Sequence, residues 1–435
     1  MAVLTTLLIA GFIVTPSLSS HANAQLTQKK VFRLGYFPNI THAQAVIGVG
    51  NGDFQKALGD NIELKSLTFN AGPSATEALL ANQIDATYIG PNPTVNGYVV
   101  SEGSAVRVIS GAASGGAVFI VRNDSGIQSS KDLGGKKFAS PQIGNTQDVA
   151  LRKYLLDNGY NTKDKGGNVE ILPVKNPDIL TLFLKKEIDG AWVPEPWGEK
   201  LIKEGNGKLF LDERTLWQGG KFVTANIVVN PEYLRNNPDV IKKFLEAHVN
   251  ETQWINSHKE DALKTFNVEL KKLTGQTIPE DELKEAVSRL ELTYDPLQET
   301  LIKSANDAFE IGFLGKTKPD LGGIFDVNIL NEVLEEKGLQ SVGDAQNQTS
   351  TTGNGTSTAV TTNLRNDQAY ILMQYTEVLM RNESQNYILF ILCPLRGTSR
   401  YLMVRDHLPD QKLRVIEVDY DDSANCELGH IPVLY

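Results

Sequence analysis

The chain has 435 residues, of which 41% are hydrophobic and 22% are charged. This composition is typical of globular proteins and excludes a disordered, collagen-like or multi-span membrane protein. The 52 acidic and 42 basic residues give a net charge of -10, so we expect no broad cationic surface for nucleic acid or anionic lipid. A negatively charged ligand would therefore have to be held by local dipoles.

The first 24 residues have the features of an export signal. An apolar stretch from Val3 to Val14 is followed by Pro16 and by small residues that end at Ala24 in an A-x-A pattern, which predicts cleavage after Ala24. The stretch is short for a spanning helix, which needs about 20 apolar residues, although a signal anchor is the alternative. The absence of a basic residue before Lys29 departs from the usual pattern. We expect a periplasmic mature protein.

Apolar runs of strand length alternate with helical patterns, which predicts an α/β fold built from βαβ units. After Pro231 the chain is expected to be mostly helical to about Gly338. The predicted strands are 31–37, 62–69, 86–90, 105–112, 117–122, 169–174, 190–193 and 222–229, and the predicted helices are 43–50, 74–81, 93–101, 146–158 and 178–186.

Two crossings between sheets are predicted, at Gly111–Gly116 and near Lys221–Asn226. They imply two lobes within residues 25–340, one of about 31–112 and 225–340 and a second of about 113–224. A ligand would lie between the lobes, where the carboxyl ends of strands and the amino ends of helices meet.

The carboxyl-terminal part differs in composition from the rest. Residues 341–364 are rich in Ser, Thr, Gly and Asn and predict a flexible linker. Residues 365–435 predict a small α+β module of unknown role, with a helix over 368–380 and strands at 387–392, 400–404 and 413–418. Its Cys393 and Cys426 are the only cysteines, and one disulfide between them would help so small a unit to fold. Cys426 and His430 are too few ligands for a metal, so neither a metal nor a cofactor is predicted.

Three segments place Gly, Pro and small polar residues where a helix begins: 70–74, 90–94 and 141–147. The first N–H groups of a helix lack partners within the helix, and its dipole is positive there, so each segment is a candidate anion site. The alternative is that Ser74, Thr94 and Thr146 only cap their helices. The same pattern occurs at three strand-to-helix turns, which favours anion binding over simple helix capping.

A fourth segment places Asn39, Thr41 and His42 directly after the first strand, where side chains can face a cleft. His42 would be a donor to an oxyanion, or else a structural histidine. In a fifth segment, Glu195 lies between two prolines and close to Trp192 and Trp197. Glu195 would bind an ammonium or hydroxyl group of the ligand. The alternative is that both tryptophans are core residues and Glu195 caps the next helix.

Five sequence segments carry a family resemblance: LGYFPNITHA (34–43), FNAGPSATEALLANQIDATYIGPNPTVNGY (69–98), SGAASGGAVFIVR (110–122), SPQIGNTQDVALRKYL (140–155) and DGAWVPEPWGEKL (189–201). Together they resemble solute-binding proteins of ABC importers of the aliphatic sulfonate, nitrate and taurine group, from about Val31 to Leu339. The resemblance implies a two-lobed periplasmic binding protein of the type II-like fold. Such a protein, expected to be a monomer, closes on a small anion or zwitterion and delivers it to a membrane permease and ATPase. By this resemblance the ligand-binding residues would be Asn39, Thr41, His42, Gly72, Ser74, Asn92, Asn145, Thr146, Trp192 and Glu195.

The sequence indicates the family more closely than it indicates the solute. Glu195 argues against a bare inorganic anion, because an unpaired carboxylate would repel it, and so favours an organosulfonate such as the zwitterion taurine. Nitrate, bicarbonate and the thiamine pyrimidine precursor are alternatives, as is a ligand sensor that signals through the carboxyl-terminal module. Thiamine-pyrimidine synthases resemble this fold but use a Cys-rich motif, and no Cys precedes Cys393 here. Because no hydrolase, zinc or Walker motif occurs either, the chain is not expected to be an enzyme.

Overall fold

The computed structural model describes residues 29–343 and the backbone of four later strands, 376–382, 387–393, 401–406 and 413–417. The chain forms two compact units, Met1–Thr349 and Ser350–Tyr435. None of the described helices combines the length and hydropathy needed to span a bilayer. The predicted signal peptide and linker fall outside the described residues and stay predictions.

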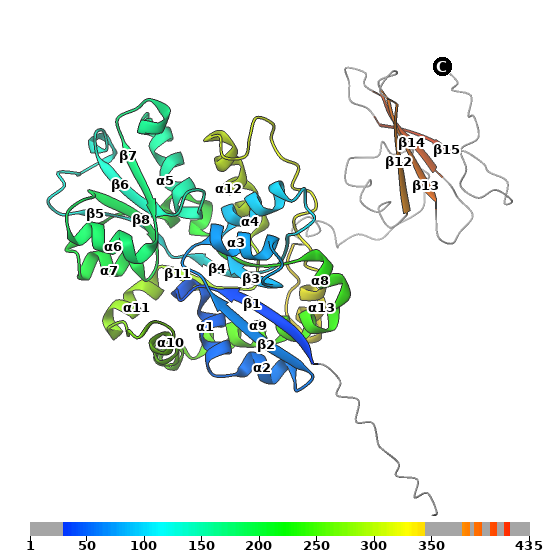
Figure 1. The fold of residues 1–435 in the computed structure, drawn as a ribbon, viewed down its shortest axis with the longest axis horizontal. Helices are drawn as coiled ribbons and strands as arrows, with labels where there is room; N and C mark the ends of the chain where they lie inside the picture. Colours follow the sequence, from blue (N-terminus) through cyan, green and yellow to red (C-terminus); the bar gives the residue numbers. More distant parts are fainter. Residues whose placement is uncertain (1–28, 344–375, 383–386, 394–400, 407–412, 418–435) are drawn as a thin grey trace, which may run out of the picture. The chain divides into compact units, whose positions relative to one another are not determined.

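The first unit contains two mixed sheets (Figure 1). The six-stranded sheet has the order β11-β4-β10-β3-β1-β2 and the five-stranded sheet the order β7-β6-β8-β5-β9. The first sheet comprises β1 Lys30–Tyr36, β2 Ile62–Thr68, β3 Ala86–Ile89, β4 Arg107–Gly115, β10 Val223–Val229 and β11 Leu290–Leu292. The second comprises β5 Ala117–Arg122, β6 Lys137–Pro141, β7 Glu170–Val174, β8 Gly190–Pro194 and β9 Gly207–Asp212.

Helices cover both faces of the six-stranded sheet. Val108 and Ile109 are neighbours in β4 but belong to different apolar clusters, because successive side chains of a strand point to opposite faces. The cluster around Ile109 includes residues of α1 Ala43–Gly50, α2 Asp53–Leu58, α8 Pro231–Asn236, α9 Pro238–Ser257, α10 Lys259–Thr274, α11 Glu280–Ser288 and α13 Asn328–Glu336. The cluster around Val108 includes residues of α3 Gly72–Leu80, α4 Pro91–Val100 and α12 Gln298–Glu310.

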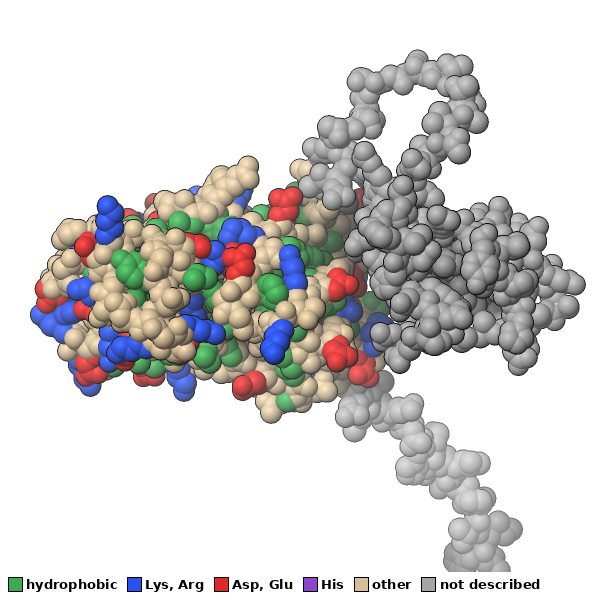
Figure 2. Space-filling model, turned by 90° about the horizontal axis from the view of Figure 1, so that it is seen from above, with side chains coloured by type: hydrophobic (Ala, Val, Ile, Leu, Met, Phe, Trp, Pro, Cys, Tyr) green, Lys and Arg blue, Asp and Glu red, His purple; other side chains and the backbone are tan. Residues whose placement is uncertain are grey.

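The five-stranded sheet is covered by α5 Thr146–Asp157, α6 Asn176–Leu184 and α7 Trp197–Lys203. Its central strand β8 is buried along its whole length, as expected for a strand covered on both faces. Figure 2 shows acidic and basic side chains interspersed over one face of the molecule.

The chain crosses twice between the sheets. The first crossing leads from β4 to β5 through Gly115 and Gly116, which both have φ 75, a left-handed conformation that glycine adopts without strain. The second leads from β9 to β10 through the short helices Glu213–Leu216 and Gln218–Gly220. The first crossing was predicted correctly. The second lies before the predicted Lys221–Asn226, because Val223 already belongs to the six-stranded sheet.

The second unit contains an antiparallel sheet in the order β12-β13-β14-β15. Its strands are β12 Thr376–Asn382, β13 Tyr387–Cys393, β14 Tyr401–Asp406 and β15 Leu413–Glu417. The three predicted strands are confirmed. The helix predicted over 368–380 is wrong for Thr376–Met380, which pair with β13, and its first part lies outside the described residues. Cys426 lies outside them as well, so the disulfide stays a prediction.

Candidate functional site

A small cavity lies between the two sheets of the first unit. Its volume is about 20 Å³, which is room for about one water molecule. It is lined by Phe37, Asn39, Thr41, His42, Asn70, Ala71, Gly90, Asn145, Thr146, Gln147, Asn176, Pro194 and Thr224. Both sheets contribute residues to this lining, and none of its side chains is an acid, a lysine or an arginine.

Four helices begin at the wall of this cavity. Ala71 and Gly90 are the residues before α3 and α4, and Asn145 is the residue before α5. Asn176 is the first residue of α6. None of these starts is capped by the side chain of the preceding residue. The positive ends of four helix dipoles therefore surround one small volume, an arrangement that favours an anion.

Two buried polar atoms in the cavity wall have no hydrogen-bond partner in the described part of the chain. They are Thr146 Oγ1 and Asn176 Oδ1, and their side chains are only 5% and 3% exposed. Buried polar atoms are almost always paired in folded proteins, so these two can take a bond from a ligand or from a water molecule in the cavity. The hydroxyl can donate to an oxyanion, and the amide oxygen can accept from an ammonium or hydroxyl group.

His42 is a neutral donor in this wall. Its ring stacks on Phe37 at 4.4 Å between centroids, and burial lowers its pKa to about 3. Nδ1 accepts a hydrogen bond from the Phe37 N–H at 3.1 Å, so the single ring proton lies on Nε2. His42 can thus donate to an anion, but it adds no positive charge at neutral pH.

The lobes are closed around the cavity. The Gly72 N–H donates to Asn145 Oδ1 at 3.1 Å, and Trp197 Nε1 donates to Asn39 Oδ1 at 3.1 Å, each bond joining one lobe to the other. On the same side, α5 packs against α12 and α4 (Figure 1). The Thr146 side chain lies so close to the Gly90 backbone that a Cβ added at Gly90 would lie 2.2 Å from Thr146 Oγ1.

Half of the residues predicted for the site line this cavity. The structure brings together five of them: Asn39, Thr41, His42, Asn145 and Thr146.

Three others lie behind or beside the wall. Gly72 donates its N–H to Asn145, and Ser74 Oγ lies 3.2 Å from Gln142 Nε2 across the lobes. The prediction that Asn92 binds the ligand needs correction. The Asn92 side chain forms two hydrogen bonds with Ser304, at 3.1 and 2.8 Å, and so has a structural role.

The predicted roles of Trp192 and Glu195 need correction too. Neither lines the cavity, and both are fully buried. Trp192 stacks on Phe119 in the core of the five-stranded lobe. Glu195 accepts from Arg289 Nη1 at 2.7 Å and from the Glu199 N–H at the start of α7, so its carboxylate is satisfied without a ligand. The core and capping alternative holds for Trp192 and Glu195, whereas Trp197 is only partly buried and bonds across the lobes to Asn39. The argument from Glu195 for a zwitterion no longer holds.

Trp192 instead donates to a buried acid on the second crossing. Its Nε1 lies 2.7 Å from Glu213 Oε2, and Trp217 Nε1 lies 3.3 Å from Oε1. Burial raises the pKa of Glu213 to about 7. Glu213 therefore stays protonated in the folded state at pH values where the unfolded chain, with a glutamate pKa near 4.5, has released the proton. This preference stabilises the folded state at low pH, and the stabilisation is lost as the pH rises towards 7.

A Glu213→Gln variant keeps the shape but cannot ionise. As the pH rises from about 5.5 to about 8, the parent chain loses the stability that protonated Glu213 provides, and the variant does not. We therefore expect the free energy of unfolding of the variant, minus that of the parent, to increase by about 2 kcal/mol over this range. Urea unfolding of both proteins at the two pH values measures this difference. An equal difference at both values would contradict it.

Asn176 is the main residue that the sequence did not reveal. The predicted helix began at Asp178, whereas α6 begins at Asn176, directly before a proline at the second helical position. The same signal, a polar residue and a proline after a strand, had identified the segment at Gly90. It would have found Asn176 had it been applied to the turn after β7.

The two sheets and the two crossings between them give the chain the two-lobed fold of periplasmic binding proteins. The chain matches the model of the NMT1-like family over residues 25–267, more than half its length, and belongs to that family.

Among curated proteins, the chain is 25% identical over 209 residues to the taurine-binding periplasmic protein of Escherichia coli, a match that covers 48% of this chain and 62% of that protein. It thus spans less than two thirds of that relative. It is 23% identical to a putative aliphatic sulfonates-binding protein of Bacillus subtilis, over 77% of this chain and 97% of that one.

Solved structures share the fold at low identity. The alkanesulfonate-binding protein SsuA from Xanthomonas axonopodis pv. citri bound to MOPS has a TM-score of 0.56 and 17% identity, and the match covers 66% of this chain and 96% of that one. The periplasmic nitrate-binding protein NrtA from Synechocystis has a TM-score of 0.58 and 15% identity, with 71% and 89% covered.

Proposed function

We propose that this chain is the periplasmic solute-binding component of an ABC importer and that its solute is an organosulfonate. The observation that carries the proposal is Thr146 Oγ1, which has no partner in the described chain and lies at the wall of a cavity where four helices begin. The curated relatives support the class of solute, because the names of two of them specify taurine and aliphatic sulfonates. Closure of the lobes would be the signal that the permease reads.

The charge of the site favours a monoanion or a zwitterion over a dianion. No cationic side chain lines the cavity, and His42 is neutral, so only helix dipoles oppose the charge of the solute. A helix start stabilises a partly buried anion by at most about 2 kcal/mol. A sulfonate carries one charge spread over three oxygens and fits such a site, whereas sulfate or a phosphate ester would bring a second charge with no counterion.

Asn176 takes over the role first given to Glu195. Its Oδ1 is an acceptor in the wall, without a partner in the described chain, and it suits the ammonium group of taurine. We propose that Thr146, His42 and the N–H groups at the start of α5 hold the sulfonate, with Asn39, Thr41 and Asn145 around them.

Nitrate is the second candidate, because it is smaller than an organosulfonate. About 20 Å³ is small for a sulfonate with a carbon chain, so an organosulfonate requires side chains in the cavity wall to move aside while the lobes stay closed. Nitrate needs less space and has the same single charge.

A thermal-shift panel on the chain without residues 1–24 tests the proposal. The panel contains taurine, alkanesulfonates, nitrate, bicarbonate, sulfate and hydroxymethylpyrimidine. A ligand at about 100 times its Kd adds about 2.7 kcal/mol to the stability of the folded state. We expect taurine or an alkanesulfonate to raise the melting temperature and sulfate to leave it unchanged. A shift with nitrate or bicarbonate alone would replace the sulfonate assignment, and a shift with sulfate would contradict the charge argument.

A further inference from the structure

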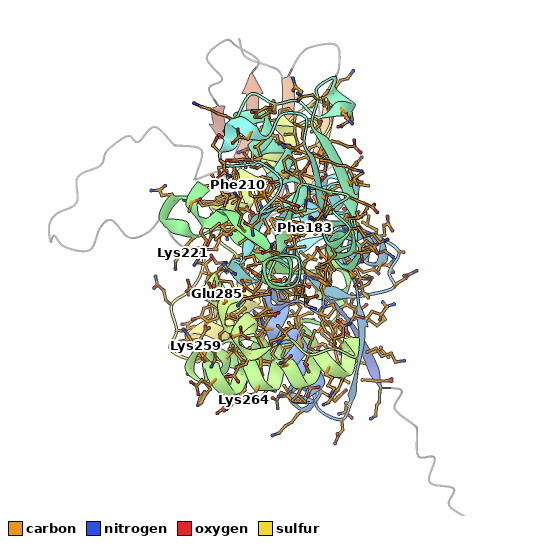
Figure 3. All side chains as sticks on the ribbon, turned by 90° about the vertical axis from the view of Figure 1, so that its left-hand side faces the viewer. Phe183, Phe210, Lys221, Lys259, Lys264 and Glu285 are labelled. Carbon is orange, nitrogen blue, oxygen red and sulfur yellow. The ribbon has the colours of Figure 1, made fainter. Side chains whose placement is uncertain are left out.

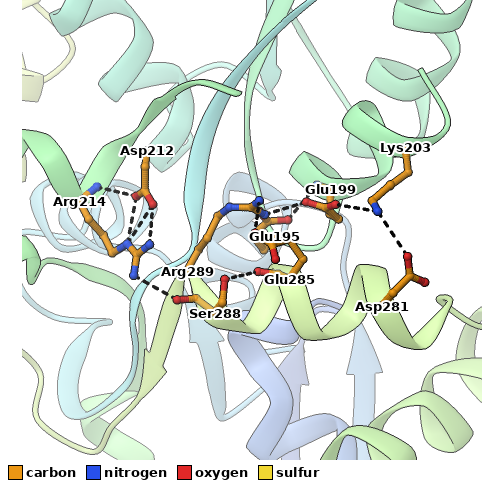
Figure 4. Close-up of polar contacts among 9 residues, drawn as sticks. All are labelled: Glu195, Glu199, Lys203, Asp212, Arg214, Asp281, Glu285, Ser288 and Arg289. Carbon is orange, nitrogen blue, oxygen red and sulfur yellow. Dashed lines mark hydrogen bonds and ion pairs between the residues drawn. The ribbon is translucent and has the colours of Figure 1, made fainter. Parts of the chain in front are cut away.

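A buried group of three charged side chains joins the lobes beside the first crossing. In this hinge cluster, which consists of Glu195, Glu199 and Arg289, Arg289 Nη1 donates to Glu195 Oε1 at 2.7 Å and to Glu199 Oε2 at 2.8 Å (Figure 4). The three residues are 0%, 2% and 7% exposed. Such pairs cost much desolvation energy and are strongly destabilising when one partner is removed, so their placement has consequences for the conformation.

The cluster bridges the lobes. Arg289 lies between α11 and β11, and β11 is the edge strand of the six-stranded sheet beside β4. Glu195 and Glu199 lie after β8 and in α7, in the five-stranded lobe. In Figure 3, Glu285 of α11 lies between Phe183 and Phe210 of the five-stranded lobe and Lys259 and Lys264 of α10.

The backbone of the crossing belongs to the same arrangement. The Gly116 N–H donates to the Arg289 carbonyl at 2.8 Å, and the Glu195 N–H donates to the Gly116 carbonyl at 2.8 Å. The side-chain bond from Arg289 to Glu195 closes this loop around Gly116. A rotation of one lobe about Gly115 and Gly116 must therefore move Arg289 relative to Glu195 or strain the bonds between them.

The turn held by Arg289 forms one wall of the solute cavity. Pro194, which directly precedes Glu195, lines the cavity, and Trp197 donates to Asn39 Oδ1 in the opposite wall at 3.1 Å. Arg289 itself is not among the lining residues. Its influence on a bound solute must pass through Glu195 and the Pro194–Trp197 turn.

We propose that Arg289 is a positioning residue for solute binding: by holding the Pro194–Trp197 turn against the six-stranded lobe, it stabilises the closed conformation without touching the solute. The predicted effect on solute binding rests on the proposed function, whereas the predicted effect on closure of the lobes does not. Loss of the guanidinium would weaken binding because the closed state would be less populated before the solute arrives.

The charges around the hinge cluster predict a pH dependence of taurine affinity, which a simple loss of stability would not produce. Facing it are Glu285, 3.0 Å from Arg289 Nη2, together with Asp281 and Glu282 of α11 and Lys203 of α7. Burial raises the pKa of Glu195 to about 7, although Arg289 and the Glu199 N–H oppose this rise. Glu195 is ionised and fully paired with Arg289 above that pH and protonated below it, so taurine affinity should fall as the pH drops from about 8 to about 6.

The test uses the full chain without residues 1–24, with taurine as the probe. Calorimetry measures the taurine Kd, and hydrogen exchange without solute measures closure at the Gly72 N–H, which bonds across the cleft, and over the turn 194–199. We expect Arg289→Met to weaken taurine binding about 10-fold and to speed exchange at both places, with partial recovery in Arg289→Lys. Exchange in α9, far from the cleft, should not change. Arg33→Met, which breaks the Arg33–Asp85 pair within one lobe, is the matched control.

Glu195→Gln is the milder variant if Arg289→Met fails to fold, because Arg289 keeps Glu199 as its partner. It should bind taurine with the same Kd at both pH values and show faster exchange at Gly72 at pH 8. Parental taurine affinity and parental exchange in a folded Arg289→Met or Glu195→Gln chain would overturn the proposal. If the parent chain itself binds no taurine, the proposed function fails and exchange at the cleft alone decides the role of Arg289.

Discussion

A Gly90→Ala variant is expected to bind solute about 100-fold more weakly than the parent chain. The new Cβ would lie 2.2 Å from Thr146 Oγ1, on the other side of the cleft. Overpacking of a dense interior costs about 1–3 kcal/mol, and here the cost arises only when the lobes close. Stability without solute should be nearly unchanged, because Gly90 has φ -75, which alanine adopts freely. Calorimetric titration and thermal unfolding measure the two quantities.

A double-mutant cycle provides the control. The Gly90→Ala, Thr146→Ala double variant lacks the Thr146 hydroxyl. The atoms nearest to the new Cβ at position 90 are then the Cβ of residue 146 at 3.3 Å and the Thr224 carbonyl oxygen at 3.4 Å, so the clash is relieved. The double variant should bind about as well as Thr146→Ala alone, which gives a large coupling between the two sites. If the two losses simply added, the steric account of closure would be wrong.

Thr146→Val should reduce the affinity by about 10- to 100-fold, because a hydrogen bond to a charged group contributes about 1.5–3 kcal/mol. The variant keeps the branched shape and removes only the hydroxyl, whose oxygen is buried without a partner in the described chain. The protein without solute should be no less stable, since no internal hydrogen bond is lost. Titration with the solute identified in the thermal-shift panel measures the change.

Thr181→Val is the matched control for this variant. Thr181 is exposed in α6 of the same lobe, and its hydroxyl donates to the Pro177 carbonyl of its own helix. Its replacement should leave the affinity unchanged. Equal affinities for the Thr146 and Thr181 variants would mean that the Thr146 hydroxyl does not contact the solute.

The sequence predicts the parts of the site that local chemistry determines. Glycine and proline after a buried strand indicate a tight turn into a helix, and such turns pointed to Thr146, Asn145 and Gly90, which line the cavity between the sheets. The alternation of strands and helices predicted the two-lobed fold for the same reason, because βαβ units bring these turns to one edge of a sheet.

What the sequence cannot supply is the distant partner of each polar side chain. Asn92 and Ser304 are far apart in the chain, as are Glu195 and Arg289, and these pairings decide which residue faces the ligand and which is already satisfied. The same limit applies to residues 376–380, where pairing with β13 overrides the predicted helical pattern.

A crystal structure of the chain without residues 1–24, with bound taurine, tests the central claim most directly. The account predicts sulfonate oxygens within about 3 Å of Thr146 Oγ1 and of N–H groups at the helix starts, with the amine at Asn176 Oδ1. It also predicts no lysine or arginine in contact with the sulfonate. A sulfonate held by a basic side chain, or bound outside the space between the two lobes, would contradict it.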